Sequence, residues 1–369
     1  MVTQEKAEHS LRVGLASRSY EIRVGSSLSP EIRDFLDQLT ARGRSVAIVS
    51  DDGFVSCQSN FLDETFGDLP RFVLPSGETT KSPESLSSIW NFLSRLRLDR
   101  SSCLFVVGGG VTGDVGGFAA ATYLRGIDFV QVPTTLLAMV DSSVGGKTGL
   151  NLPTGKNLAG AFHQPCAVFA DVELLRTLPE KEFSAGMAEV VKYGLLGNRE
   201  LYERLLSLGP LSTKSPELPS IIEVCCAEKA RVVEEDERET SEGSGGRALL
   251  NLGHTFAHAI EAVSGYGDYL HGEAVAVGMM CALRLSEEMD FLEKGFESEL
   301  KDFLVGQGLP VELREPLELQ SLMAAMRSDK KVRGGLLRFV VLDAIGESRV
   351  VDDVPLERVE RIWRSFGAA

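Results

Sequence analysis

Three of the five histidines fall within residues 247–273, RALLNLGHTFAHAIEAVSGYGDYLHGE. His254 and His258 are four residues apart in a run with helical patterning, so both imidazoles should lie on one helical face. His271 follows a predicted turn and precedes a second apolar helix. Imidazoles bind metals and carry protons. The spacing alone leaves two interpretations open: a metal or proton-transfer site, or histidines held by ordinary hydrogen bonds.

The histidine pair lacks the glutamate of the HExxH pattern that marks zinc-protease helices. A third ligand would therefore have to come from elsewhere in the chain. Asn251 and Arg247 lie one and two turns before His254, and we expect them on the same side of the helix. A polar face opposite an apolar one favours a lined cavity over a plain core helix.

Composition bounds the class of protein. A chain of 369 residues with 43% apolar and 25% charged residues is long enough for two globular domains. It has no run as long as a membrane span and no signal-peptide core at the N-terminus, which predicts a cytoplasmic protein without a membrane partner. The net charge of −15 argues against nucleic-acid binding, so an anionic ligand would need a local basic pocket. The six scattered cysteines are expected to be reduced.

The first half of the chain alternates between strand and helix patterns. A hairpin is predicted from 11–15 and 20–25, strands at 45–49, 71–74, 103–107 and 129–132, and helices at 30–39, 82–96 and 115–122. This alternation is typical of a doubly wound α/β domain.

A glycine run at 108–114 follows a buried strand and precedes a helix, as in the GxGxxG loops that admit a pyrophosphate. The expected acidic partner is out of place, because Asp128 begins the next strand instead of ending it. Asp51, at the carboxyl end of strand 45–49, could contact a ribose together with Glu78 and Lys81. Alternatively, Asp51 only caps the following turn.

The GKT at 146–148 is not a P-loop, because Asp141 occupies the position of the required glycine. The segment instead offers Asp141 and Lys147 to a ligand, and Lys156 and Asn157 follow. A plain surface loop is the alternative for each of these residues.

The alternation stops near 171–180, which predicts an α/β domain at 1–175 and a mostly helical domain at 176–369. Helices are expected at 183–196 and 218–234, then a loop at 234–246, two helices after His271, and a strand pair at 336–342 and 348–351. Glu189 and Lys192 are three apart on the first of these helices, where a structural ion pair is the simplest interpretation.

The motifs taken together resemble the 3-dehydroquinate synthase family. The resemblance runs along residues 70–335 and includes SGETTKS, GGGVTGDVGG, PTTLLAMVDSSVGGKTG, AEVVKYG, LNLGHTFAHAIE, HGEAVAVGM and DKKV. It implies a Rossmann-like domain that binds NAD, a helical domain that holds a divalent metal, zinc or cobalt, and a homodimer.

The resemblance also implies roles for individual residues. The metal ligands would be Glu189, His254 and His271, whereas His258 would face the substrate. Other residues matching catalytic or substrate-binding positions are Arg125, which would reach the partner subunit's site, and Asp141, Lys147, Asn157, Lys192, Lys229, Arg247, Asn251 and Lys330. Residues matching nucleotide-binding positions are Asp51, Glu78, Lys81, Gly109, Gly110, Asp114, Thr134, Thr135, Lys156 and Thr177.

The implied reaction converts 3-deoxy-D-arabino-heptulosonate 7-phosphate to 3-dehydroquinate and phosphate. It combines transient oxidation by NAD, phosphate elimination, re-reduction and intramolecular aldol closure. A related cyclase of sedoheptulose 7-phosphate or glucose 6-phosphate, a metal-dependent polyol dehydrogenase and a non-catalytic nucleotide-binding protein are the alternatives. Those cyclase substrates lack the carboxylate, so the presence of Arg247, Asn251 and Lys330 favours the dehydroquinate reaction. One departure is the segment 240–246, which is longer than the usual link before Arg247.

Overall fold

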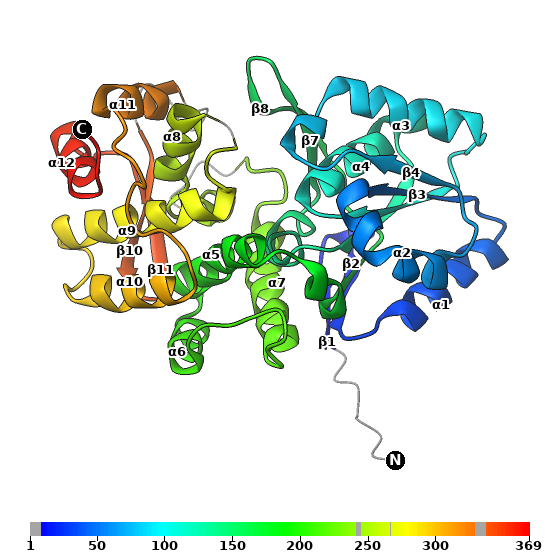
Figure 1. Ribbon diagram of the computed structural model, residues 1–369, viewed down its shortest axis with the longest axis horizontal. Coiled ribbons are helices and arrows are strands. Elements are labelled where there is room, and N and C mark those ends of the chain that lie inside the picture. The colour runs from blue at the N-terminus through cyan, green and yellow to red at the C-terminus, as the bar shows by residue number, and fades with distance from the viewer. Residues whose placement is uncertain (1–8, 241–244, 266, 329–336) are drawn as a thin grey trace, which may run out of the picture. The chain divides into compact units, whose positions relative to one another are not determined.

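The computed structural model describes residues 9–240, 245–265, 267–328 and 337–369 (Figure 1). The chain divides into two compact units: Met1–Pro179 with Thr213–Glu234, and Glu180–Ser212 with Glu235–Ala369. The predicted division after residue 175 is close to the first boundary. The predicted and observed divisions differ at residues 213–234, which the prediction placed in the helical domain and the structure places in the first unit.

A seven-stranded sheet forms the core of the first unit, in the order β1-β2-β9-β6-β5-β3-β4. Only β1 and β2 pair antiparallel, as the predicted hairpin, and the remaining pairs are parallel. The strands are β1 (His9–Val13), β2 (Tyr20–Gly25), β3 (Val46–Asp51), β4 (Arg71–Leu74), β5 (Cys103–Gly108), β6 (Asp128–Pro133) and β9 (Ala167–Asp171). The predicted α/β fold of this part of the chain is confirmed.

Helices cover both faces of this sheet (Figure 1). One apolar cluster joins the sheet to α1 (Ser29–Ala41) and α2 (Asp52–Phe66), and a second joins it to α3 (Pro83–Arg95) and α4 (Gly110–Thr122). Neighbouring strands β3 and β5 thus continue into helices on opposite faces. In doubly wound sheets a ligand crevice opens beyond the carboxyl ends of such a strand pair.

Several elements of this unit differ from the sequence prediction, and strand β9 was not predicted. Helix α2 follows β3 directly where only a turn was expected, and α4 begins at Gly110, five residues before the predicted start. The expected loop after Asp141 is a hairpin of β7 (Lys147–Leu152) and β8 (Gly155–Phe162). Glycines concealed the hairpin, because they disfavour strands in general but here permit close approach: a Cβ at position 160 would lie 2.2 Å from the carbonyl oxygen of Thr148.

Helix α7 (Leu218–Glu235) packs in the first unit through polar contacts with a short π-helix, Ala138–Ser142. The Cys226 thiol donates to the carbonyl oxygen of Met139 at 3.3 Å, and the Lys229 ammonium donates to the carbonyl oxygen of Asp141. Both acceptor carbonyls lie in the last turn of this short helix, where backbone carbonyls can accept from side chains. These contacts explain why the segment belongs with the sheet and not with the helices that surround it in sequence.

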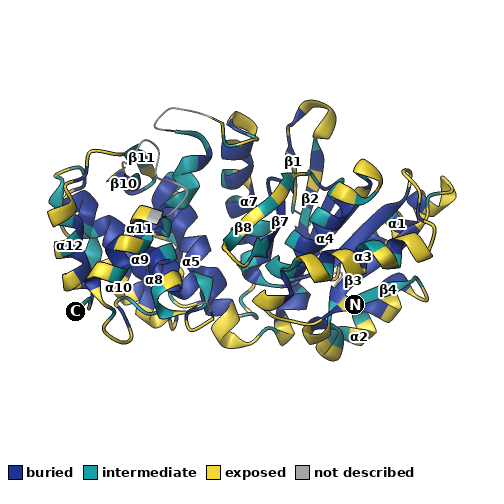
Figure 2. Cartoon of the chain, turned by 90° about the horizontal axis from the view of Figure 1, so that it is seen from above, coloured by how far each residue is buried: buried dark blue, intermediate teal, exposed yellow. Residues whose placement is uncertain are grey.

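The second unit is mostly helical, as predicted. Its elements are α5 (Glu180–Gly197), α6 (Arg199–Leu208), α8 (His254–Ser264), α9 (His271–Glu288), α10 (Phe296–Gly306), α11 (Leu319–Ser328), the pair β10 (Phe339–Ala344) and β11 (Glu347–Val351), and α12 (Leu356–Ser365). From His271 to Ser328 the structure has three helices, α9, α10 and α11, where two were predicted. Figure 2 shows α5 as a largely buried helix. No helix among the described residues is long and apolar enough to cross a bilayer.

Two glycines set how closely α9 packs against its neighbours. A Cβ on Gly272 would lie 1.8 Å from the carbonyl oxygen of Ala185 in α5, and one on Gly278 would lie 2.1 Å from that of Gly253, just before α8. Both contacts are with backbone atoms, which cannot rotate away. Helix α9 therefore approaches α5 and the start of α8 backbone to backbone.

We expect Gly272→Ala to destabilise the protein by at least about 1–3 kcal/mol, because the added methyl group would force α5 and α9 apart. Urea unfolding followed by circular dichroism would measure this change in the free energy of unfolding. Gly245→Ala is the matched control, since its Cβ would meet no atom within 4 Å. Equal stabilities of the two variants would contradict the packing argument.

Candidate active site

Three potential metal ligands converge in the second unit. The ligand atoms of Glu189, His254 and His271 all lie within 4.8 Å of one another. Both imidazoles direct Nε2 toward Glu189 Oε1, each at 3.5 Å. Glu189 comes from the middle of α5, whereas the histidines are the first residues of α8 and α9. One carboxylate and two imidazoles form a donor set typical of a catalytic zinc or cobalt site.

The helix starts are defined by local sequence. Gly253 has a left-handed backbone, with φ of 77°, and starts α8 at His254. Glu273 starts α9 at His271 by accepting a hydrogen bond from the Leu270 amide at 2.8 Å. The predicted continuous helical face is thus wrong: Arg247 and Asn251 lie in a separate 3₁₀ turn, Gly246–Asn251, before the break at Gly253.

Other predicted site residues also lie in the second unit. The Lys192 ammonium forms an ion pair with Glu189 Oε2, and both side chains are 1% exposed. His258 lies with its ring centroid 5.7 Å from that of His254 and 6.5 Å from that of His271, outside the ligand cluster. The Arg247 side chain is buried and donates to the carbonyl oxygen of Glu237 at 2.8 Å. Asn251 donates to the carbonyl oxygen of Ala248 at 3.2 Å.

A second carboxylate beside the cluster, which sequence reasoning missed, belongs to Glu261. Its Oε2 lies 3.5 Å from His271 Nδ1. Partial burial of His271 opposes the charged imidazolium, but hydrogen bonding with Glu189 and Glu261 outweighs it and raises the pKa of His271 to about 10. The available sequence signal was spacing, because Glu261 follows His254 by seven residues and so shares its face of α8.

The candidate dinucleotide site lies in the first unit, at the carboxyl ends of β3 and β5. Asp51 ends β3, and Oδ1 accepts from the Phe54 amide at 2.9 Å while Oδ2 accepts from the Thr112 hydroxyl at 3.0 Å. Asp51 therefore caps α2 and also faces the glycine loop after β5. A carboxylate there matches the ribose-binding position of dinucleotide sites.

The start of α4 presents backbone to this crevice. Gly109 is its N-cap residue and provides no side-chain hydrogen bond to the first turn. Added Cβ atoms at Gly109 and Gly110 would lie 3.1 Å from Thr135 and Ser142 side-chain atoms, respectively. A glycine-lined helix N-terminus suits a pyrophosphate, which needs amide donors and close approach.

Two further pairs involve predicted nucleotide contacts. Lys81 forms an ion pair with Asp114 Oδ2, and burial raises the pKa of Asp114 while the lysine opposes that shift. Glu78 Oε1 accepts from Asn151 Nδ2 at 2.7 Å, which connects the segment before α3 to β7.

The remaining predicted nucleotide contacts are more dispersed. The Thr134 amide donates to the carbonyl oxygen of Gly108 at 3.0 Å, and the Thr135 hydroxyl accepts from the Ala138 amide at 3.1 Å. Thr177 accepts from Gln58 Nε2 at 3.1 Å, and Lys156 lies on the β7–β8 hairpin.

Basic and polar residues predicted for the substrate also lie in the first unit. Lys229 Nζ contacts Asp141 Oδ1 at 2.7 Å, on the π-helix just before the hairpin. Lys147 begins β7 and is exposed, and Asn157 lies on β8 with a positive φ of 54°. The exposed Arg125 also has a positive φ, 71°. Lys330 lies outside the described residues.

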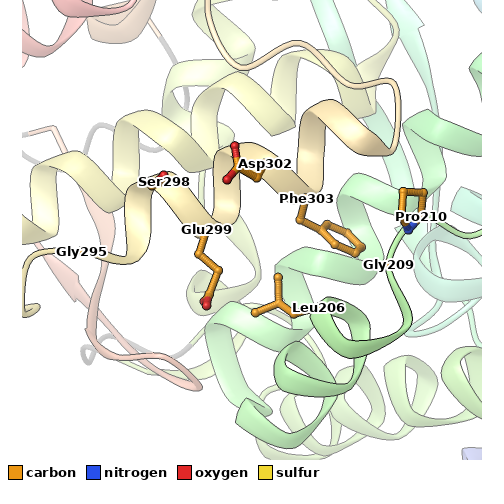
Figure 3. Close-up of a pocket in the computed structure, with 8 residues that line it drawn as sticks. All are labelled: Leu206, Gly209, Pro210, Gly295, Ser298, Glu299, Asp302 and Phe303. Atoms are coloured by element: carbon orange, nitrogen blue, oxygen red, sulfur yellow. The ribbon is translucent and has the colours of Figure 1, made fainter.

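An open surface depression between α6 and α10 is separate from these sites (Figure 3). Its lining includes Leu206, Phe303, Glu299 and Asp302, but none of the predicted site residues. We therefore place the chemistry at the clusters described above.

Family models and curated relatives identify the family of the chain. The model described as 3-dehydroquinate synthase N-terminal matches residues 71–185, and that described as 3-dehydroquinate synthase C-terminal matches residues 186–332. The 3-dehydroquinate synthase of Opitutus terrae is 53% identical over 361 residues, covering 98% of this chain and 99% of the relative. That of Rhodopirellula baltica is 44% identical and covers 95% of each chain.

A solved structure shares the whole fold. It is a 2-deoxy-scyllo-inosose synthase complexed with carbaglucose-6-phosphate, NAD+ and Co2+, at 27% identity. The match has a TM-score of 0.85 and covers 97% of this chain and 100% of the other. These matches extend over nearly the entire sequence, and we conclude that the chain belongs to the 3-dehydroquinate synthase family.

Proposed function

We propose that this protein converts 3-deoxy-D-arabino-heptulosonate 7-phosphate to 3-dehydroquinate and phosphate, the reaction of its family. The observation that carries this proposal is the convergence of Glu189, His254 and His271 on one point. Three protein ligands leave positions open for substrate oxygens, as a catalytic metal site requires. The metal is zinc or cobalt, and the second cofactor is NAD.

The two cofactors supply chemistry that side chains lack. When bound, the metal polarises substrate hydroxyl and carbonyl oxygens, and NAD accepts and later returns a hydride. The crevice beyond β3 and β5 holds the dinucleotide, with Asp51 toward a ribose and the Gly109–Gly110 backbone toward the pyrophosphate. Glu78, Lys81, Asp114, Thr134, Thr135, Lys156 and Thr177 complete this site.

The protein's own residues manage protons and negative charge. His258 lies beside the ligand cluster without belonging to it, and its imidazole transfers protons to and from the substrate. Lys147, Lys192, Lys229 and Arg247 bind the phosphate and carboxylate groups, and Lys330 joins them. Such local cations are needed because the chain as a whole carries a net charge of −15. Asp141, Asn157 and Asn251 orient these cations and the substrate hydroxyls.

The protein acts as a cytoplasmic homodimer, and Arg125 reaches the partner subunit's site. Leu124 and Arg125 both have positive φ, at 50° and 71°, in an exposed turn. Leu124 is 40% exposed, which gives this turn an apolar side chain next to the arginine. A large exposed apolar residue beside a cation suits a subunit interface.

His254→Ala should weaken cobalt binding by more than about 100-fold, beyond the loss typical for residues that only orient a ligand. His258→Ala should leave the cobalt affinity nearly unchanged, because His258 lies outside the proposed ligand cluster. Competition with a chromophoric chelator would measure both affinities. Equal losses of cobalt affinity in the two variants would indicate that His254 and His258 both bind the metal.

Purified protein given NAD, a divalent metal and the heptulosonate phosphate should release inorganic phosphate without accumulating NADH. Glu189→Ala should reduce turnover at least about a thousandfold, because the metal supplies several kcal/mol of charge stabilisation. Phosphate release and absorbance at the NADH band would be followed together. Activity with sedoheptulose 7-phosphate but not with the heptulosonate phosphate would contradict the proposed substrate. Formation of NADH in stoichiometric amounts would indicate a dehydrogenase.

A further inference from the structure

The two imidazoles of the ligand cluster are anchored by different acceptors. His254 Nδ1 lies 3.1 Å from the carbonyl oxygen of Leu252, a neutral backbone group. His271 Nδ1 faces the carboxylate of Glu261, with 3.5 Å between Nδ1 and Oε2. In both residues Nδ1 is turned away from Glu189, so Nε2 is the atom offered to the cluster.

Glu261 is an unusual residue for its place in the fold. It is 6% exposed on α8, a helix whose other buried residues include Phe256 and Ile260. Burying a carboxylate costs free energy unless partners compensate. Core packing would be served better by an apolar residue here. The position is explained if the carboxylate acts on the imidazole that it faces.

We propose that Glu261 is a positioning residue for the metal site: it holds the proton on His271 Nδ1 and thereby directs the Nε2 lone pair to the metal. This inference rests on the metal site of the proposed function. Carboxylate acceptors behind metal-binding histidines fix the tautomer and ring orientation and raise the basicity of the ligand nitrogen.

Charge gives Glu261 a second effect. With neutral imidazoles, the groups around a divalent cation are the carboxylates of Glu189 and Glu261 and the ammonium of Lys192, which leaves a net charge of one positive unit. Without Glu261 the same site would carry a net charge of two positive units. In a buried site this extra charge weakens cation binding, because low polarity amplifies the Coulomb interaction.

Glu261→Ala should reduce cobalt affinity about 10- to 100-fold, as is typical for residues behind a metal ligand. Glu261→Gln retains an oxygen acceptor but not the charge, and should lose less. Chelator competition would give the affinities. In zinc-loaded protein, the ¹⁵N chemical shifts of the His271 ring should show the proton on Nδ1 in the wild type and a change at Nδ1 in Glu261→Ala, whereas a loss of overall stability alone would leave the shifts of the folded protein unchanged.

Glu287→Gln is the matched control. Glu287 is also a buried glutamate, 7% exposed on α9, and accepts from the Gly295 amide at 3.1 Å. This variant should bind cobalt like the wild type. If Glu261→Ala fails to fold, Glu261→Gln alone decides, because loss of the charge must still lower affinity.

Wild-type cobalt affinity and an unchanged Nδ1 signal in the Glu261 variants would overturn the positioning role while leaving the proposed function intact. Failure of the wild-type protein to bind cobalt would overturn the metal site itself, and this inference with it. Measuring the wild type first therefore separates the two proposals.

Discussion

The backbone contact between α9 and its neighbours is the constraint on which the ligand cluster depends. Position 272 lies beside the α5 carbonyl of Ala185, and position 278 beside the carbonyl of Gly253. Larger residues at these positions would move the helices apart and spread the ligand atoms. Glu189, His254 and His271 are far apart in sequence, and only this close packing brings their ligand atoms within 4.8 Å.

Close packing also places charges where water is scarce. Glu189 and Lys192 are each 1% exposed, and the desolvation cost of such a pair can exceed its Coulomb gain. Apolar residues would stabilise the same helices at least as well. The pair is understandable as part of the proposed metal site, because a carboxylate is a ligand that divalent metals take in catalytic sites.

In the first unit, the important feature is backbone that a ligand can approach. Adjacent strands β3 and β5 are followed by helices α2 and α4, which pack on opposite faces of the sheet. In such sheets the carboxyl ends of the two strands border a crevice. Asp51 caps α2 and contacts Thr112 on α4, and thus links both sides of it. Both interpretations of Asp51 that the sequence left open are therefore compatible: a helix cap can also present an oxygen to a ribose.

Sequence alone determined the strand and helix alternation, the glycine loop and the family, because hydrophobic periodicity and motif order are local properties of the chain. Spacing showed that His254 and His258 share a helix face, but not what that face meets. Tertiary structure decided that His254 and His271 face Glu189, that Glu261 lies behind His271, and that α7 packs with the sheet. The structure also shows the β7–β8 hairpin where a loop was predicted. The need for glycine there becomes clear only from the close approach of the neighbouring strand. The physical reason is the same in each case: these choices depend on contacts between residues distant in sequence, which no local pattern records.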